Sequence, residues 1–306
     1  MSTITFLGLG QMGGPMAANL VKAGHRVVGY DLAPEALEHA AAAGVLLADR
    51  PDAAAEEADF VITMLPTGQH VLDVYADPAG PLAASKPDTV FIDSSTISVG
   101  QAKAAARLAA AAGRRAVDAP VSGGIFGAQA ATLTFMVGGD EADVAQAKGV
   151  LEGMGKRIVH CGPHGAGQAA KICNNMVLGI SMAAVSEAFV LGEKLGLDPQ
   201  VFYDVASASS AQCWALTTNC PIPGPVPASP ANRDYQGGFA TALIAKDLKL
   251  AVEAADEAGT ATEFGRLAAK LFREHADNGA ARLDFSSILV ALREQAGQTD
   301  DQERNI

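Results

Sequence analysis

The sequence is poor in cysteine, in positive charge and in long apolar runs. Its 306 residues contain four cysteines and no C-x-x-C pair, which excludes a disulfide framework and favours a reduced, cytoplasmic protein. Lysine and arginine number 22 against 34 acidic residues, and the net charge of −12 disfavours a nucleic-acid partner. No unbroken apolar run reaches about eighteen residues and the N-terminal residues carry no targeting signal, so no membrane partner is expected.

Motifs of several other enzyme classes are also missing. The chain has no G-x-S-x-G and no H-E-x-x-H motif. His160 and His164 are four positions apart, but Gly162 and Pro163 between them prevent a shared helix face. A hydrolase or a zinc enzyme is therefore disfavoured, and no metal site is expected.

The N-terminal half instead alternates short β-like runs with alanine-rich helical stretches. This alternation predicts a doubly wound, mostly parallel sheet. The predicted strands are Ile4–Leu7, Arg26–Tyr30, Phe60–Leu65, Val90–Asp93, Arg115–Asp118, Thr132–Val137 and Arg157–His160. Predicted helices are Met12–Ala23, Pro34–Ala43 and Val99–Ala112.

The pattern changes near Gly162, after which only helical stretches follow. They cover Gly167–Leu195, Phe239–Ala258, Glu263–Asn278 and Ser286–Gln295, and a proline-rich loop at Pro221–Pro230 separates the first two. We therefore predict an α/β Rossmann-type dinucleotide-binding domain (residues 1–163) followed by an all-α C-terminal domain (164–296) for substrate binding and oligomerisation. Residues 297–306 are predicted to form a disordered tail.

A glycine-rich turn joins the first predicted strand to the first predicted helix. Its residues are Gly8, Leu9, Gly10, Gln11, Met12 and Gly13, which have the G-x-G-x-x-G spacing of dinucleotide-binding proteins. The glycines permit a tight turn and close approach to a pyrophosphate, and the helix N-terminus favours an anion. The alternative is a glycine-rich turn without a ligand, which the strand–helix context disfavours.

Asp31 ends the second predicted strand, at the position from which an acidic residue bonds the adenosine ribose. A carboxylate there repels the 2′-phosphate of NADP, and Leu32 and Ala33 offer no arginine to bind it. NAD is therefore the predicted cofactor. A strand-end cap is the alternative for this residue considered alone.

The later strands are also followed by polar segments. Met64–Thr67 and Asp93–Thr96 lie at the strand edge where such sheets bind ligands, although both could be ordinary turns. Ser122, Gly123 and Gly124 could bind an anion through a hydroxyl and backbone N–H groups, or form a flexible loop.

Lys171 is the candidate base for proton transfer. It shares a helix face with Asn175 and lies among apolar residues, where burial would lower its pKa toward neutrality. A solvated surface lysine is the alternative. Lys246 and Asp247 begin a later helical stretch and could form a surface ion pair, or Lys246 could reach the cofactor or the substrate carboxylate.

Four segments together resemble the β-hydroxyacid dehydrogenase family. Gly8–Leu20 is similar to its cofactor signature, Asp118–Gly124 to its substrate segment, Gly167–Asn175 to its catalytic segment, and Lys246–Leu248 to its C-terminal signature. Later residues look like the 3-hydroxyisobutyrate branch of the family; they are Cys213, Trp214, Asn232, Tyr235–Phe239 and Asp284–Ser287.

The resemblance implies an NAD-dependent oxidation of 3-hydroxyisobutyrate to methylmalonate semialdehyde in valine catabolism, by a homodimer or homotetramer. It implies that Leu65, Pro66, Thr96 and Lys246 contact NAD. It further implies that Ser122, Gly123 and Gly124 bind the substrate carboxylate, while Lys171, assisted by Asn175, takes the hydroxyl proton. The alternatives are a tartronate semialdehyde reductase or an L-serine-type dehydrogenase of the same family, and a non-catalytic NAD-binding module.

Overall fold

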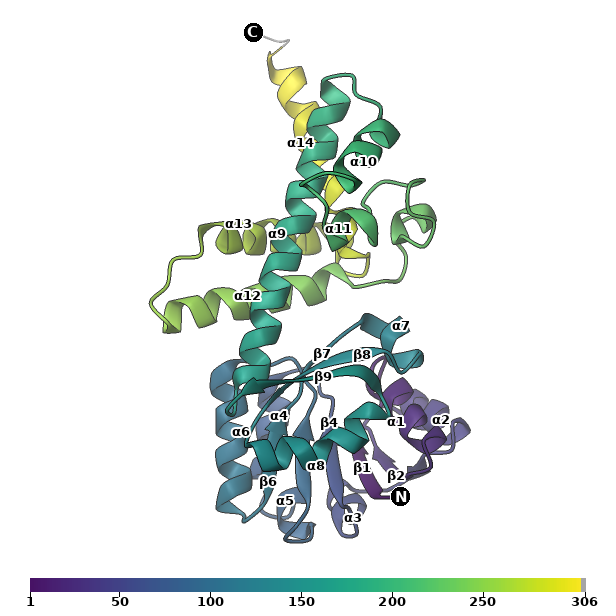
Figure 1. The fold of residues 1–306 in the computed structure, drawn as a ribbon, viewed down its shortest axis with the longest axis vertical. Coiled ribbons are helices and arrows are strands. Elements are labelled where there is room, and N and C mark those ends of the chain that lie inside the picture. The colour runs from purple at the N-terminus through teal and green to yellow at the C-terminus, as the bar shows by residue number, and fades with distance from the viewer. Residues whose placement is uncertain (304–306) are drawn as a thin grey trace. The chain divides into compact units, whose positions relative to one another are not determined.

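The computed structural model describes residues 1–303, without the side chains of residues 298–303. The chain divides into two compact units, Met1–Lys171 and the part that begins at Ile172. Figure 1 shows a sheet covered by helices in unit 1 and helices alone in unit 2. The predicted fold class, an α/β Rossmann-type domain followed by an all-α domain, is confirmed.

Unit 1 is built on one nine-stranded sheet. Its strands are β1 (Thr3–Leu7), β2 (Arg26–Tyr30), β3 (Leu46–Leu47), β4 (Phe60–Thr63), β5 (Val90–Asp93), β6 (Arg115–Asp118), β7 (Val121–Ser122), β8 (Leu133–Gly138) and β9 (Gly155–Gly162). They follow the order β3-β2-β1-β4-β5-β6-β8-β7, and β9 pairs with β8. The strands from β3 to β6 are parallel, whereas β8 is antiparallel to β6 and β7. The order reverses between β1 and β4, which is where ligands bind in doubly wound sheets.

Helices connect these strands. They are α1 (Gly13–Lys22), α2 (Pro34–Ala42), α3 (Pro51–Ala55), α4 (Gly68–Ala76), α5 (Pro81–Ala84), α6 (Val99–Ala111), α7 (Gly124–Gln129) and α8 (Glu141–Glu152). The two-residue strands β3 and β7 and five of these helices, α3, α4, α5, α7 and α8, were not predicted. The two strands are too short to show an alternating pattern, and the helices α3, α5 and α7 are too short to show a helical period. The helix α4 was missed although its buried residues Val71 and Tyr75 have helical spacing.

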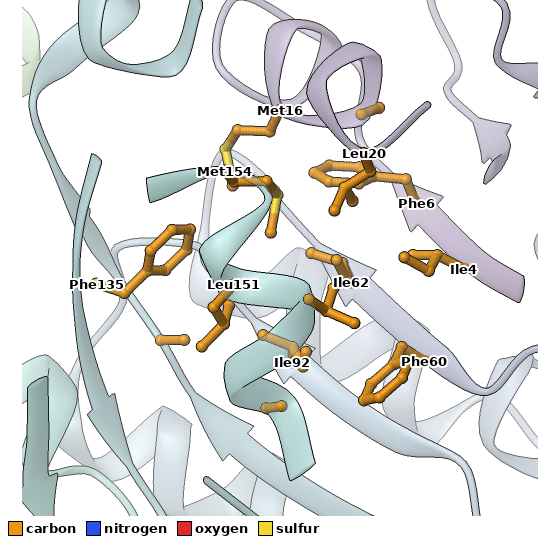
Figure 2. Packing of buried hydrophobic residues seen from close by; sticks show 14 of the residues in the cluster. Ile4, Phe6, Met16, Leu20, Phe60, Ile62, Ile92, Phe135, Leu151 and Met154 are labelled. Atoms are coloured by element: carbon orange, nitrogen blue, oxygen red, sulfur yellow. The ribbon is translucent and has the colours of Figure 1, made fainter. Parts of the chain in front are cut away.

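Apolar side chains point alternately to the two faces of the sheet and form a core on each. Phe60 and Ile62 of β4 belong to one core, and Val61 between them belongs to the other. Figure 2 shows the first core, where Met16 of α1 and Leu151 of α8 approach the strand residues. Burial on both faces explains why these strands are apolar throughout.

Unit 2 is all-helical in the part that the structure describes. Its helices are α9 (Ala166–Lys194), which begins in unit 1, α10 (Pro199–Ser207), α11 (Trp214–Thr217), α12 (Thr241–Glu257), α13 (Glu263–His275) and α14 (Ile288–Glu303). Phe189, Leu248, Phe272 and Phe285 are among the buried side chains of its core. Gly179 lets α9 and α12 approach closely, because a Cβ atom there would lie 2.9 Å from the side chain of Leu248.

Two predicted boundaries differ from the structure. Unit 1 extends to Lys171 rather than to residue 163, because the first turn of α9 bonds to residues of the sheet. The predicted disordered tail is helical up to Glu303, since α14 continues through it, and residues 304–306 lie outside the described part of the chain. Polar composition marks exposed residues and does not stop a helix that has already formed.

The helix α9 is long and apolar enough to cross a membrane, judged by length and composition alone. It also carries the polar residues Gln168, Lys171 and Asn175, all of them buried. Polar groups within a bilayer are costly, whereas the core helix of a folded domain can bond them. The absence of a membrane partner stays a prediction.

Candidate functional site

The turn between β1 and α1 has the geometry of a dinucleotide cradle. Gly8 has φ +95°, and a Cβ atom there would lie 2.3 Å from the Met64 carbonyl oxygen. A Cβ on Gly13 would lie 1.9 Å from the Gly8 carbonyl oxygen, so the helix can begin against the strand only with glycine. Gly10 faces open space, with nothing within 4 Å of an added Cβ. The first turn of α1 has no side-chain cap and no acidic residue, so no carboxylate of its own competes with a bound anion for the positive end of the helix dipole.

Asp31 follows β2 and is bonded to this turn. Its Oδ2 accepts a hydrogen bond from Leu9 N at 2.6 Å and its Oδ1 accepts one from Ala33 N at 2.8 Å. Each carboxylate oxygen can accept a further bond, so both remain able to receive ribose hydroxyls. The backbone bonds fix the negative charge beside the glycine turn, where the sequence predicted it.

This geometry leads to a test of cofactor choice. Removing the charge in Asp31→Asn relieves repulsion of a 2′-phosphate, and we expect the preference for NAD over NADP in kcat/KM to fall by about 10- to 100-fold. Glu35→Gln is the matched control, because Glu35 is an exposed acid in the first turn of α2. Equal discrimination in Asp31→Asn and in the control would remove Asp31 from this role.

The ends of β4 and β5 are joined by a polar network. Leu65 N donates to Ser95 Oγ at 2.8 Å, and Asp93 Oδ1 accepts from Thr63 Oγ1 at 2.8 Å and from Ser95 N at 3.1 Å. Thr96 follows directly and is half-buried, whereas Pro66 is exposed. The structure therefore brings the segments of Leu65 and Thr96 together at the carboxyl edge of the sheet.

Asp93 is buried and was not singled out from the sequence as a site residue. Burial raises its pKa to about 6, against the lowering effect of its bonds to Ser95 and Thr63. The folded protein thus holds this proton more tightly than the unfolded chain, and stability falls as pH rises from about 4 to above 6. A shift of this size corresponds to about 3 kcal/mol at neutral pH.

We expect Asp93→Asn to raise the free energy of unfolding at pH 8 by up to about 3 kcal/mol, because the amide cannot ionise and still offers Oδ1 as an acceptor. Urea unfolding between pH 4 and pH 8 measures this, and the slope over that window should become shallower. Asp88→Asn, at an exposed aspartate, is the control. Identical pH profiles for Asp93→Asn and wild type would contradict the assignment.

Asp118 ends β6 and joins the substrate segment to α9. It is buried, its Oδ1 accepts from Gly165 N at 2.6 Å, and its Oδ2 accepts from Gln168 N at 3.0 Å. Burial raises the pKa of its carboxyl, against the lowering effect of these two bonds. A Cβ on Gly167 would lie 2.3 Å from the Met136 carbonyl oxygen, so glycine permits the close approach of α9 to the sheet.

Ser122 lies in β7 and is followed by the short helix α7, so this segment is a strand–helix turn and not the flexible loop that was the alternative. Gly123 has φ +134° and Gly124 has φ +61°. Gly124 opens α7, where N–H groups have no partner within the helix. The hydroxyl and these N–H groups are hydrogen-bond donors of the kind that bind a carboxylate.

Lys171 is 7% exposed and is the last residue of unit 1. It is therefore not the solvated surface lysine that was the alternative. The glycine turn, the Leu65 and Thr96 segments, Ser122–Gly124 and Lys171 all belong to this unit. The proposed proton acceptor is thus carried by the α/β unit and not by the all-helical domain to which the sequence assigned it.

Asn175 follows one turn later on α9, and its partners lie in unit 2. Its Nδ2 donates to Asp247 Oδ2 at 2.5 Å, and its Oδ1 accepts from Asn174 Nδ2 at 2.9 Å. The ion pair considered from the sequence does form, since Asp247 Oδ1 lies 3.5 Å from Lys246 Nζ; Asp247 is buried, whereas the Lys246 side chain is 36% exposed. The two bonds with Asp247 and Asn174 fix the orientation of the Asn175 amide.

The sequence missed Asp93, Asp118, Gln168 and Asp247 as site residues. Each could have been noticed in the sequence, because Asp93 and Asp118 end predicted strands, Asp247 directly follows Lys246, and Gln168 precedes Lys171 by three positions. No group of three or more histidine, cysteine or acidic side chains that could hold a metal is present in the described residues.

Comparison with known proteins agrees with both units. Residues 3–162 match the family model described as the NAD binding domain of 6-phosphogluconate dehydrogenase. Residues 165–292 match the model described as NAD-binding of NADP-dependent 3-hydroxyisobutyrate dehydrogenase.

Three relatives that match over nearly the whole chain are named 3-hydroxyisobutyrate dehydrogenase. The 3-hydroxyisobutyrate dehydrogenase of Pseudomonas aeruginosa is 50% identical, with 96% of this chain and 99% of the relative covered. The mitochondrial 3-hydroxyisobutyrate dehydrogenase of Drosophila melanogaster is 47% identical, with coverages of 95% and 90%. A solved structure of the Mycobacterium tuberculosis 3-hydroxyisobutyrate dehydrogenase with L-serine is 54% identical, with a TM-score of 0.92 and coverages of 96% and 99%. The chain belongs to the 3-hydroxyisobutyrate dehydrogenase family and is an NAD-binding oxidoreductase.

Proposed function

We propose that the chain oxidises 3-hydroxyisobutyrate to methylmalonate semialdehyde with NAD, a step of valine catabolism. The names of the full-length relatives support the substrate. The observation that carries the proposal is the pair of bonds from Gly165 and Gln168 to Asp118, which tie the Lys171 helix to the strand that precedes Ser122. The anion-binding segment and the proposed proton acceptor thereby belong to one rigid part of the fold.

The substrate carboxylate is bound by the hydroxyl of Ser122 and the N–H groups of Gly123 and Gly124. These donors are uncharged, and the positive φ values of the two glycines turn the backbone so that successive N–H groups can converge on one anion. Fixing the carboxylate fixes the position of the hydroxyl at C3, since only two carbon–carbon bonds separate the carboxyl carbon from C3 in a 3-hydroxy acid.

Lys171 accepts the hydroxyl proton. Its side chain is 7% exposed, which keeps the acceptor out of bulk water, and a lysine takes up a proton when it is in the neutral amine form. Asn175, held by Asp247, assists by bonding the substrate oxygen. Bound NAD supplies the acceptor for the hydride that leaves C3, so that the alcohol becomes an aldehyde.

NAD rather than NADP is the proposed cofactor because of Asp31 and its fixed carboxylate. The family model whose description contains NADP covers residues 165–292 and so does not include Asp31. The glycine turn, Leu65, Pro66 and Thr96 line the cofactor in this proposal, and Lys246 is proposed to contact it as well.

A panel of short hydroxy acids tests the substrate. NADH formation is measured with 3-hydroxyisobutyrate, L-serine and D-glycerate, and we expect the highest kcat/KM with the first. A higher kcat/KM for L-serine or D-glycerate would assign the chain to the serine or tartronate semialdehyde branch. L-serine is included as an alternative substrate because the M. tuberculosis structure was solved with L-serine. NAD binding without NADH formation from any of them would indicate a non-catalytic module.

The active form is proposed to be a homodimer or homotetramer of the cytoplasm. Support for assembly comes from exposed apolar side chains on α9, including Val177 and Leu191, and from a groove of about 630 Å³ that Leu191 lines with Leu292 of α14. The low cysteine content and the absence of a C-x-x-C pair support a cytoplasmic location. Light scattering on purified protein measures the mass, and a monomer at micromolar concentration would contradict the assembly.

A further inference from the structure

Gln168 is completely buried near the start of α9, and its amide makes two bonds to one loop. Its Nε2 donates to the Ser95 carbonyl oxygen at 2.8 Å, and its Oε1 accepts from Ile97 N at 3.2 Å. These two positions flank Thr96, which is proposed to line the cofactor. A single side chain thus holds both sides of a cofactor-lining residue.

The backbone of Gln168 is held as firmly as its side chain. Its N–H donates to Asp118 Oδ2, and Gly165 N donates to the other carboxylate oxygen. The first turn of α9 is therefore attached to β6 through the backbone and to the loop after β5 through the side chain. Lys171 follows Gln168 by three residues, less than one helical turn along the same rigid helix.

Glutamine is suited to this position because it offers a donor and an acceptor at the end of one flexible stem. A methionine would fill the same space but leave the Ser95 carbonyl and the Ile97 N–H without their partner. Both bonds to the loop are made to backbone groups next to Thr96, so losing them would affect the position of Thr96 directly.

We propose that Gln168 is a positioning residue that sets Lys171 against the cofactor-lining loop Ser95–Ile97. It acts through Lys171, so the inference rests on the proposed role of that lysine as proton acceptor. Its contribution is orientation, with no direct contact to the reacting atoms. Misplacement of a catalytic group by about 1 Å can lower a rate by about 100-fold, which sets the scale of the expected effect.

The first experiment compares Gln168→Met with Thr89→Val. Thr89 is also buried, and its Oγ1 donates to the Ala58 carbonyl oxygen at 2.7 Å, at the opposite end of β5 from the loop. We expect Gln168→Met to lower kcat by about 10- to 100-fold with a much smaller change in KM for the hydroxy acid. Thr89→Val should alter neither constant. An equal effect of both variants on kcat, or a change confined to KM, would overturn the proposal.

A double-mutant cycle with Lys171→Ala separates positioning from a structural role. If Gln168 acts through Lys171, Gln168→Met causes no further loss of the residual kcat once Lys171 is alanine. If the two losses multiply, Gln168 acts independently of Lys171 and the proposal is wrong. Should Gln168→Met fail to fold, Gln168→Glu takes its place in the cycle, because it keeps the length and the acceptor but loses the donor to Ser95.

The cycle also distinguishes this inference from the proposed function. A Lys171→Ala variant with near-normal kcat would refute the role of Lys171 itself, whatever Gln168 does. A Lys171→Ala variant that is inactive beside a fully active Gln168→Met would leave the proposed function intact and refute only the positioning role.

Discussion

The Lys171→Ala variant is expected to lose about three orders of magnitude in kcat while its affinity for NAD changes little. General base catalysis contributes about 10²- to 10⁴-fold, and alanine has no group to receive the hydroxyl proton. A thousandfold loss corresponds to about 4 kcal/mol of transition-state stabilisation. The glycine turn and Asp31 do not depend on this side chain, so NAD binding is retained. Steady-state kinetics with 3-hydroxyisobutyrate and NAD titration by calorimetry measure the two effects.

Lys171→Arg decides what kind of contribution the lysine makes. A guanidinium keeps the positive charge but does not give up its proton in proteins, so it can anchor a carboxylate and cannot act as a base. We therefore expect Lys171→Arg to be nearly as slow as Lys171→Ala. Lys148→Ala, which removes an exposed lysine from α8, serves as the control and should behave as wild type.

Recovery of kcat in Lys171→Arg would show that the charge matters and proton transfer does not. Near-normal kcat in Lys171→Ala would remove the residue from the chemistry altogether. In that event another group must receive the proton, and buried Asp118 would have to be tested, since its pKa is raised by burial.

Local features of this site could be predicted from the sequence because the residues that make them are close in the chain. The glycine turn is one short segment between a strand and a helix, and Asp31 reaches it from the end of the adjacent strand. The strand–helix–strand unit fixes how far apart these residues lie in space, so their spacing in the sequence was enough to predict their positions. Apolar strands buried on both faces were likewise identified, since their composition follows from their position.

Bonds between distant residues could not be predicted. Gln168 meets Ser95 across 73 positions, and Asn175 meets Asp247 across 72. No local pattern encodes these pairs, because they depend on how the strands are ordered and on where glycines allow α9 to approach the sheet. The compact unit extends past the predicted boundary at residue 163 for the same reason, since the bonds to Asp118 attach the start of α9 to unit 1.

Helix α10 shows a different cause of error. No helix was predicted between Leu195 and the proline-rich loop, but Pro199 occupies the first turn of α10, where proline is favoured because its missing N–H would have no partner there. Asp198 before it caps the helix by accepting from Gln200 N and Val201 N. An Asp–Pro pair therefore indicates a helix start at this place, and the sequence contained enough information to recognise it.

Two glycines of the dinucleotide turn are expected to fail in opposite ways when they are replaced by alanine. In Gly13→Ala the new Cβ would lie 1.9 Å from the Gly8 carbonyl oxygen and 3.0 Å from the ring of Phe6, so strand and helix must separate. We expect a loss of about 3 kcal/mol or more in the free energy of unfolding. NAD binding should be lost with it, because the turn that carries Gly10 is displaced.

Gly10→Ala should leave the fold nearly unchanged and still impair the cofactor site. Its Cβ would meet no atom of the protein within 4 Å, and Gly10 has no left-handed φ, so the stability should stay within about 1 kcal/mol of wild type. The added methyl group would stand where the backbone must approach a pyrophosphate, and we expect the Kd for NAD to rise by about 100-fold. Urea unfolding and calorimetric titration with NAD measure the two quantities separately.

Gly149→Ala is the control for the substitution itself. Gly149 lies within α8, also with open space around an added Cβ, so alanine there should stabilise the helix by about 0.5–1 kcal/mol and leave NAD binding unchanged. If Gly10→Ala bound NAD as wild type does, the open space at Gly10 would not be where the pyrophosphate lies. If Gly13→Ala were as stable as Gly149→Ala, the close contact of β1 with α1 would not constrain residue 13. We expect a stable Gly10→Ala that binds NAD poorly and an unstable Gly13→Ala. Together these results would separate the two functions of glycine in this turn, which are close approach to the pyrophosphate and close packing of strand and helix.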